Sequence, residues 1–190
     1  RFIAAGCLAA TAQTELNVNN VRTTILAGGD MWWDLDNGKY EIPKGSGIHS
    51  MFAGSIWIGG LDDFGNLKVA SMRYRQNGSS DFWPGPLNSN TESDNYGTTN
   101  SNICNEFDRH WSIYKSDIIE YKNYLDCVSD DDCDENILFE NYTVPEAIQS
   151  WPGNYIDNDG NLILLAPFKD ENGDGEYTVG IDYPEYNLNG

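Results

Sequence analysis

The sequence is poor in basic residues. Only 11 lysine and arginine residues stand against 30 aspartate and glutamate residues, which gives the 190 residues a formal net charge of −19. A surface of this sign repels nucleic-acid phosphates and anionic lipid headgroups, so we expect neither nucleic acid nor membrane as a partner. Apolar runs are short as well. None beyond the N-terminal segment nears the roughly 18 residues that a membrane-spanning helix needs.

Signals of catalysis are also missing. Histidine occurs only as His49 and His110, and neither has zinc-ligand spacing to a cysteine, so a zinc site is the weaker interpretation of the cysteines. The chain has no nucleophile elbow around a serine and no glycine-rich phosphate loop. We therefore expect a protein that is not an enzyme. A glycosidase-type carboxylate pair stays an open alternative, although no spacing among the 30 acidic residues locates one.

The N-terminal segment has the pattern of an export signal. The apolar run from Phe2 ends in Ala10-Thr11-Ala12, which is typical of a cleavage site after Ala12. This pattern predicts that residues 1–12 are a signal peptide remnant and that the protein is secreted, to the cell exterior or the outer-membrane surface.

Export would permit disulfide bonds. Cys127 and Cys133 enclose a short acidic loop that a disulfide could close, and they are the candidate pair. Cys104 is then either unpaired or bonded to a cysteine beyond Gly190.

What the chain has in quantity is aromatic residues, with six Trp and eleven Tyr, and these argue for a folded core despite the charge. The alternation of side chains over 51–75 predicts a β-hairpin that turns at 59–66. Its first strand is apolar on both faces, so we expect a central strand covered on both sides. Further strands are expected at 21–27 and, buried, at 161–168.

A helical pattern follows a polar, proline-containing loop. Six apolar residues recur at spacings of three and four and predict one amphipathic helix of about 20 residues, from Glu106 to Leu125: Phe107, Trp111, Tyr114, Ile118, Tyr121 and Leu125. A second, short helix is expected from Thr143, with Pro145 near its first turn. The expected fold is mainly β and sandwich-like, α+β by content. One β-rich domain would span 13–190 with a helical insertion at 105–150, and we expect it to be the N-terminal fragment of a longer chain.

The sharpest local motif is Asp-Glu-Asn-Gly-Asp-Gly at 170–175. Aspartate or asparagine at the first, third and fifth positions and glycine at the sixth match the first half of an EF-hand-type calcium loop. The twelfth position is Ile181 rather than glutamate, and the nearest carboxylate comes one residue later. We therefore predict a variant calcium (Ca²⁺) loop over 170–182, whose ligands are Asp170, Asn172, Asp174, Glu176 through its carbonyl, and Asp182. The alternative is an aspartate-rich turn without metal.

Two other acidic segments resemble this loop more weakly. Residues 157–160, Asp-Asn-Asp-Gly, are more typical of a hairpin turn than of a metal loop. The acidic cluster between Asp126 and Glu135 is more typical of a solvated surface than of a second cation site.

Several segments in order resemble the N-terminal region of large secreted proteins of Bacteroidota, which typically end in a type IX secretion sorting domain. The matching segments are GGDMWWDL (28–35), YEIPKGSGIHSMFAGSIWIGGLD (40–62), LKVASMRYRQ (67–76), DFWPGPL (81–87), CNEFDRHW (104–111) and LAPFKDENGDGEYTVGIDYP (165–184). The resemblance implies export and display on the cell surface or release. It implies no activity, because the family is mostly described as surface proteins of unknown function. The family's aspartate-rich loop matches Asp170, Asn172 and Asp174.

Three functions are consistent with these observations. The first is a structural or adhesive cell-surface module stabilised by calcium, with surface proteins or glycans as partners. The second is a carbohydrate-binding or carbohydrate-degrading surface protein, in which Trp32, Trp33, Trp83 and Trp151 would stack on sugars. The third is a self-assembling subunit of a surface filament or secretion-linked assembly, which would expose apolar patches or open strand edges.

Overall fold

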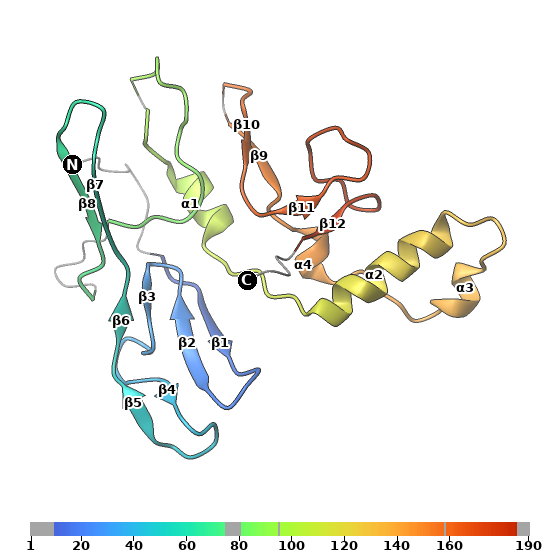
Figure 1. The fold of residues 1–190 in the computed structure, drawn as a ribbon, viewed down its shortest axis with the longest axis horizontal. Helices are drawn as coiled ribbons and strands as arrows, with labels where there is room; N and C mark the ends of the chain where they lie inside the picture. Colours follow the sequence, from blue (N-terminus) through green and yellow to red (C-terminus); the bar gives the residue numbers. More distant parts are fainter. Residues whose placement is uncertain (1–9, 75–80, 95, 158, 186–190) are drawn as a thin grey trace. The chain divides into compact units, whose positions relative to one another are not determined.

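The structure is a computed structural model that describes residues 10–74, 81–94, 96–157 and 159–185. It groups the chain into two compact units, 1–110 and 111–190 (Figure 1). The sequence pattern instead predicts a single domain over 13–190. Each unit is described on its own below.

The first unit is built around an antiparallel sheet in the order β5-β4-β2-β3-β6, with β1 paired to β2. Its strands are β1 (Gln13–Leu16), β2 (Arg22–Leu26), β3 (Asp30–Met31), β4 (Tyr40–Glu41), β5 (His49–Met51) and β6 (Gly54–Ser55). The strand predicted at 21–27 is confirmed as β2. It is the centre of the sheet because its β-branched residues pair with β1 on one side and with β3 and β4 on the other.

The predicted hairpin is confirmed as β7 (Trp57–Leu61) and β8 (Leu67–Ser71), which form a two-stranded sheet of their own. The prediction that its first strand is central and covered on both sides is wrong. All five residues of β7 are exposed, and within the described residues β7 pairs only with β8. The two apolar faces therefore do not enter the core of the described part of the chain.

The single helix predicted from Glu106 to Leu125 is also wrong: two helices, α1 (Ser101–Phe107) and α2 (Lys115–Val128), occupy this region. The side chain of Asn100 caps α1. The chain leaves the helix at Asp108, whose carboxylate accepts hydrogen bonds from the backbone N–H groups of Thr11 and Ala12, at 2.7 to 2.9 Å. A contact 96 residues away in sequence thus overrides the local helical pattern.

The second unit begins with α2, which buries Ile118 and Tyr121 and ends in a disulfide-closed loop. The disulfide joins Cys127 and Cys133, the pair predicted from their spacing. Cys104, in the first unit, also lies in a disulfide bond, whose partner is outside the described residues. The short helices α3 (Glu135–Leu138) and α4 (Glu146–Gln149) follow. The predicted short helix is α4, with Pro145 at its N-cap.

Two antiparallel strand pairs complete the second unit: β9 (Asn154–Ile156) with β10 (Leu162–Leu164), and β11 (Phe168–Lys169) with β12 (Tyr183–Pro184). The buried strand predicted at 161–168 is wrong, because this region divides into two short strands and the side chains of Leu162 and Leu164 are exposed. The described chain thus consists of small antiparallel sheets and short helices, which is consistent with an α+β content. No sandwich is seen within either unit of the described chain.

None of the helices in the described part of the chain is both long and apolar enough to cross a membrane.

Candidate metal centre

The predicted calcium loop lies between the two strands of the last pair. Because β11 and β12 pair antiparallel, with Lys169 opposite Tyr183, the residues just beyond this pair face each other across the base of the loop. These residues are Asp170 and Asp182. Strand pairing therefore brings the first and last predicted ligands together, although twelve positions separate them in sequence.

Asp182 is the fixed point of the loop. Its side chain is fully buried, and each carboxylate oxygen accepts a backbone hydrogen bond, Oδ1 from Glu171 N at 2.9 Å and Oδ2 from Thr178 N at 2.7 Å. A carboxylate oxygen has two lone-pair sites. Both oxygens of Asp182 therefore retain capacity to contact a cation while they hold the loop.

Asp170 shapes the turn. Its Oδ1 accepts from Gly173 N at 2.6 Å and its Oδ2 from Gly175 N at 2.9 Å. Both glycines are left-handed, with φ of 75° and 83°, a conformation that costs glycine little and other residues more. The glycines of the motif thus let the chain turn tightly around the Asp170 carboxylate.

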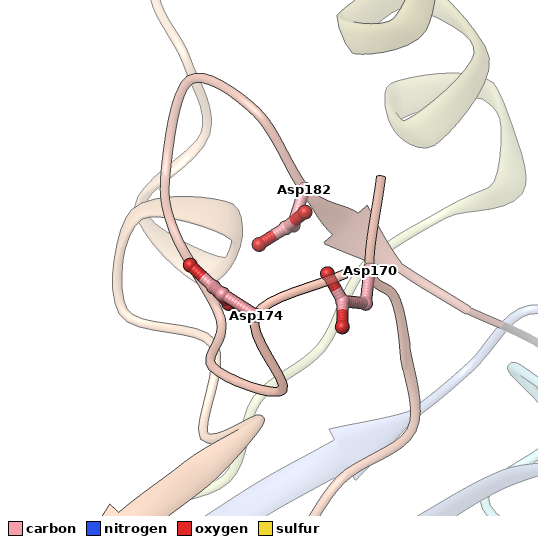
Figure 2. A group of neighbouring side chains, drawn as sticks. All are labelled: Asp170, Asp174 and Asp182. Carbon is pink, nitrogen blue, oxygen red and sulfur yellow. The ribbon is translucent and has the colours of Figure 1, made fainter. Parts of the chain in front are cut away.

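Asp174 completes the cluster from the exposed side of the loop. Its Oδ1 accepts from Glu176 N at 2.8 Å and its Oδ2 from Asn172 Nδ2 at 2.8 Å. Figure 2 shows the side chains of Asp170, Asp174 and Asp182 as neighbours within the loop. One oxygen from each lies within 4.8 Å of the others.

The three carboxylates of this cluster have no basic partner among the residues that the structure describes, because no lysine or arginine there forms an ion pair with any of them. Two charges about 5 Å apart repel by about 1 kcal/mol in bulk water and by several times as much at lower dielectric. Calcium takes six to eight oxygens, mostly from carboxylates, carbonyls and water. A cation at this point would therefore replace repulsion by attraction.

The other two predicted ligands are placed differently. The Glu176 carboxylate does not belong to the cluster, which leaves its carbonyl as the expected ligand atom. Asn172 is exposed and its amide faces Asp174, with Oδ1 accepting a long hydrogen bond of 3.3 Å from Asp174 N.

Two tyrosines that the sequence analysis did not assign to the site fix the rim of the loop. The Tyr121 hydroxyl on α2 accepts from Gly180 N at 2.7 Å, and the Tyr177 hydroxyl donates to Ile148 O at 2.8 Å. Burial raises the pKa of both phenols above the usual value, so both stay neutral. Tyr121 was predicted to lie on the apolar helix face, but its hydroxyl partner could not be found from spacing.

The other acidic segments do not gather ligands. In the β9–β10 turn, Asp157 Oδ1 accepts from the backbone N–H groups of Asp159 and Asn161 at 2.9 and 2.8 Å, which is the hairpin-turn interpretation. Within the described residues, the carboxylates of Asp170, Asp174 and Asp182 are the group that lies close enough together to hold a metal ion. No residue of the acidic cluster between Asp126 and Glu135 belongs to such a group.

The four tryptophans predicted to stack on sugars differ in solvent exposure. Trp33 is buried, whereas Trp32, Trp83 and Trp151 are half-buried. The most exposed tryptophan that the structure describes is Trp57 on β7, at 69%. Trp32, Trp33 and Trp83 belong to the first unit and Trp151 to the second.

Comparison of the chain with known protein families, with curated proteins and with solved structures found no match.

Proposed function

We propose that this chain is a non-enzymatic structural or adhesive module of a secreted or cell-surface protein, and that calcium bound in the loop 170–182 stabilises its second unit. The observation that carries the proposal is the convergence of three carboxylates without a cationic partner in the described chain. Calcium would join the carboxylates to the carbonyl of Glu176, the side chain of Asn172 and water.

The consequence of calcium binding follows from mass action. A cation that binds the folded loop and not the unfolded chain stabilises the fold by RT ln(1 + [Ca²⁺]/Kd). Extracellular calcium modules bind with dissociation constants of about 10⁻⁴ to 10⁻³ M, which suits a site whose ligands Asn172, Asp174 and Glu176 are exposed. The disulfide between Cys127 and Cys133 fits the oxidising compartment that export would provide.

A location outside the cell is part of this proposal. It is supported by the N-terminal apolar pattern, by the disulfides and by the resemblance to secreted Bacteroidota surface proteins. The charge of −19 supports the absence of nucleic acid among the partners. Surface proteins and glycans remain the proposed partner classes.

A calcium titration followed by backbone NMR tests the site. We expect the amide signals of Glu171 and Thr178 to shift in a saturable way, because both N–H groups are bonded to Asp182. Asp174→Asn should weaken binding at least about tenfold, since it removes one charge from the exposed side of the cluster.

Asp159→Asn is the matched control, because Asp159 is an exposed aspartate in a turn of the same unit and lies outside the cluster. Its affinity should equal that of the unmodified protein. Signals that do not move up to 10 mM calcium, or equal weakening by both variants, would remove the proposal.

A further inference from the structure

The β7–β8 hairpin presents a continuous apolar face to solvent. In the hairpin register, Trp57 lies opposite Ser71, Gly59 opposite Val69, and Leu61 opposite Leu67, so these six residues share one face. Trp57 is 69% exposed, Leu61 71%, Leu67 72% and Val69 59%. Two-stranded sheets are marginally stable alone, which makes a face of this kind a candidate for a partner.

The Trp57 side chain in this face is held in one position. The Trp57 indole Nε1 donates to Met72 O at 3.0 Å, which fixes the ring while its surface stays open. A fixed aromatic ring next to aliphatic side chains is the usual composition of an interface anchor.

Gly59 lies in the middle of this face, and the described chain gives no reason for a glycine there. Its φ is not left-handed, and an added Cβ would meet only Lys68 O at 3.8 Å and Val69 Cγ2 at 3.9 Å, which are ordinary contacts. Glycine inside a strand weakens it and often marks the close approach of another backbone. Gly59 thus forms a notch beside the projecting ring of Trp57.

Charge favours a second copy as the occupant, and the exposed area is compatible with one. The hairpin residues 57–71 carry Asp62, Asp63 and Lys68, a net charge of −1 within a chain of net charge −19, so two copies can meet here with little of the repulsion of their other surfaces. The exposed fractions of Trp57, Leu61, Leu67 and Val69 correspond to roughly 400–700 Å² per copy, if each side chain offers about 150–250 Å². Two copies would bury roughly 800–1,400 Å², a range that includes the lower limit of specific interfaces.

We propose that the apolar face formed by Trp57, Gly59, Leu61, Leu67 and Val69 is a homodimer interface, in which the hairpins of two copies pack face to face and Trp57 of each copy fills the notch at Gly59 of the other. A twofold axis makes this exchange reciprocal. The interface lies wholly within the first unit, and it is independent of the calcium loop in the second.

Sedimentation equilibrium of the whole chain, with calcium and with chelator, tests the interface. We expect a concentration-dependent dimer in both conditions. Leu67→Lys should raise its dissociation constant at least about tenfold. Gly59→Val should do the same although it adds apolar surface and favours a strand, because it fills the notch. Val18→Lys, at an equally exposed apolar residue outside the hairpin, should leave the dissociation constant within about twofold.

Circular dichroism of each variant verifies that it is folded. If the Leu67→Lys variant is not folded, Leu61→Lys takes its place. A chain that is monomeric at every concentration overturns the proposal. So does a dimer that resists both lysine substitutions in the hairpin, or one that Gly59→Val leaves equally tight or tightens. A dimer that Val18→Lys disrupts as strongly as Leu67→Lys also overturns it.

Discussion

Aspartate carboxylates that accept backbone hydrogen bonds recur at the turns of this chain. Asp62 and Asp157 hold their hairpin turns in the same way, each through Oδ1 to the N–H groups two and four residues later. The backbone N–H of Asn37, with Lys39 beside it, lowers the pKa of Asp34 to about 2. Asp170 accepts hydrogen bonds from the backbone N–H groups of Gly173 and Gly175 in the loop 170–182. Aspartate side chains thus satisfy backbone N–H groups at turns where no neighbouring strand accepts from them.

At the same scale, we expect His110 to make stability depend on pH. Burial lowers the pKa of its imidazole below the usual 6.5, while Asp108 opposes this more weakly. The folded state therefore binds the proton less readily than the unfolded state. The contribution of neutral His110 to the free energy of unfolding is fully present above pH 6.5. It is lost as the pH falls through that value towards the lower pKa of the folded state.

Denaturant unfolding at pH 7.5, 6.5 and 5.5 measures this effect. The free energy of unfolding should fall towards pH 5.5 in the unmodified protein and fall less in His110→Gln, which retains a partner for Thr14 Oγ1. The slope is shallow, because the imidazole is partly solvent-exposed and its charge is screened. Equal slopes in the two proteins would show that His110 is not responsible.

At the scale of elements, the break between α1 and α2 depends on Asp108. Its carboxylate holds Thr11 and Ala12 at the start of β1, and Ala12 O in turn accepts from Ala27 N after β2. Asp108, where a longer helix would have continued, instead bonds the end of α1 to the start of β1 at the edge of the sheet. Local periodicity of Trp111 and Tyr114 could not reveal this, because the deciding partner lies about 96 residues away in sequence.

Asp108→Ala should therefore lower the free energy of unfolding by about 1 kcal/mol, because the part-buried N–H of Ala12 loses its acceptor while the exposed N–H of Thr11 can bond to water. The measurement is chemical denaturation at pH 7. Glu106→Ala is the control, since Glu106 is exposed on the same helix, and it should change stability by less than about 0.5 kcal/mol. Indistinguishable midpoints for the two variants would contradict the role given to Asp108.

Sequence patterns predict best those features of the fold that depend on contacts between residues close in sequence. The hairpin at 57–71, the strand at 22–26, the disulfide and the proximity of the Asp170, Asp174 and Asp182 carboxylates all rest on residues near one another in sequence or on a single strand pair. Burial was predicted less well. Apolar runs such as 51–58 and 161–168 indicated a core, yet Trp57 and Leu164 are exposed in the structure, because a two-stranded sheet has no layer of its own to cover it.

At the scale of the whole molecule, the two units carry separate features: the apolar hairpin face in the first and the acidic loop in the second. The loop is fastened to its own unit through Tyr121 on α2 and through Tyr177, which bonds Ile148. Calcium bound at Asp170, Asp174 and Asp182 should therefore stabilise the second unit, including α2. The first unit contains none of these contacts and should respond little.

Hydrogen exchange of the backbone amides, with calcium and with chelator, tests the central claim most directly. We predict slower exchange with calcium at 168–184 and along the Tyr121 face of α2, with little change in the β7–β8 hairpin, because calcium would raise the free energy of opening only where the loop is fastened. No difference between the two conditions, or a change confined to the first unit, would contradict a calcium-stabilised module.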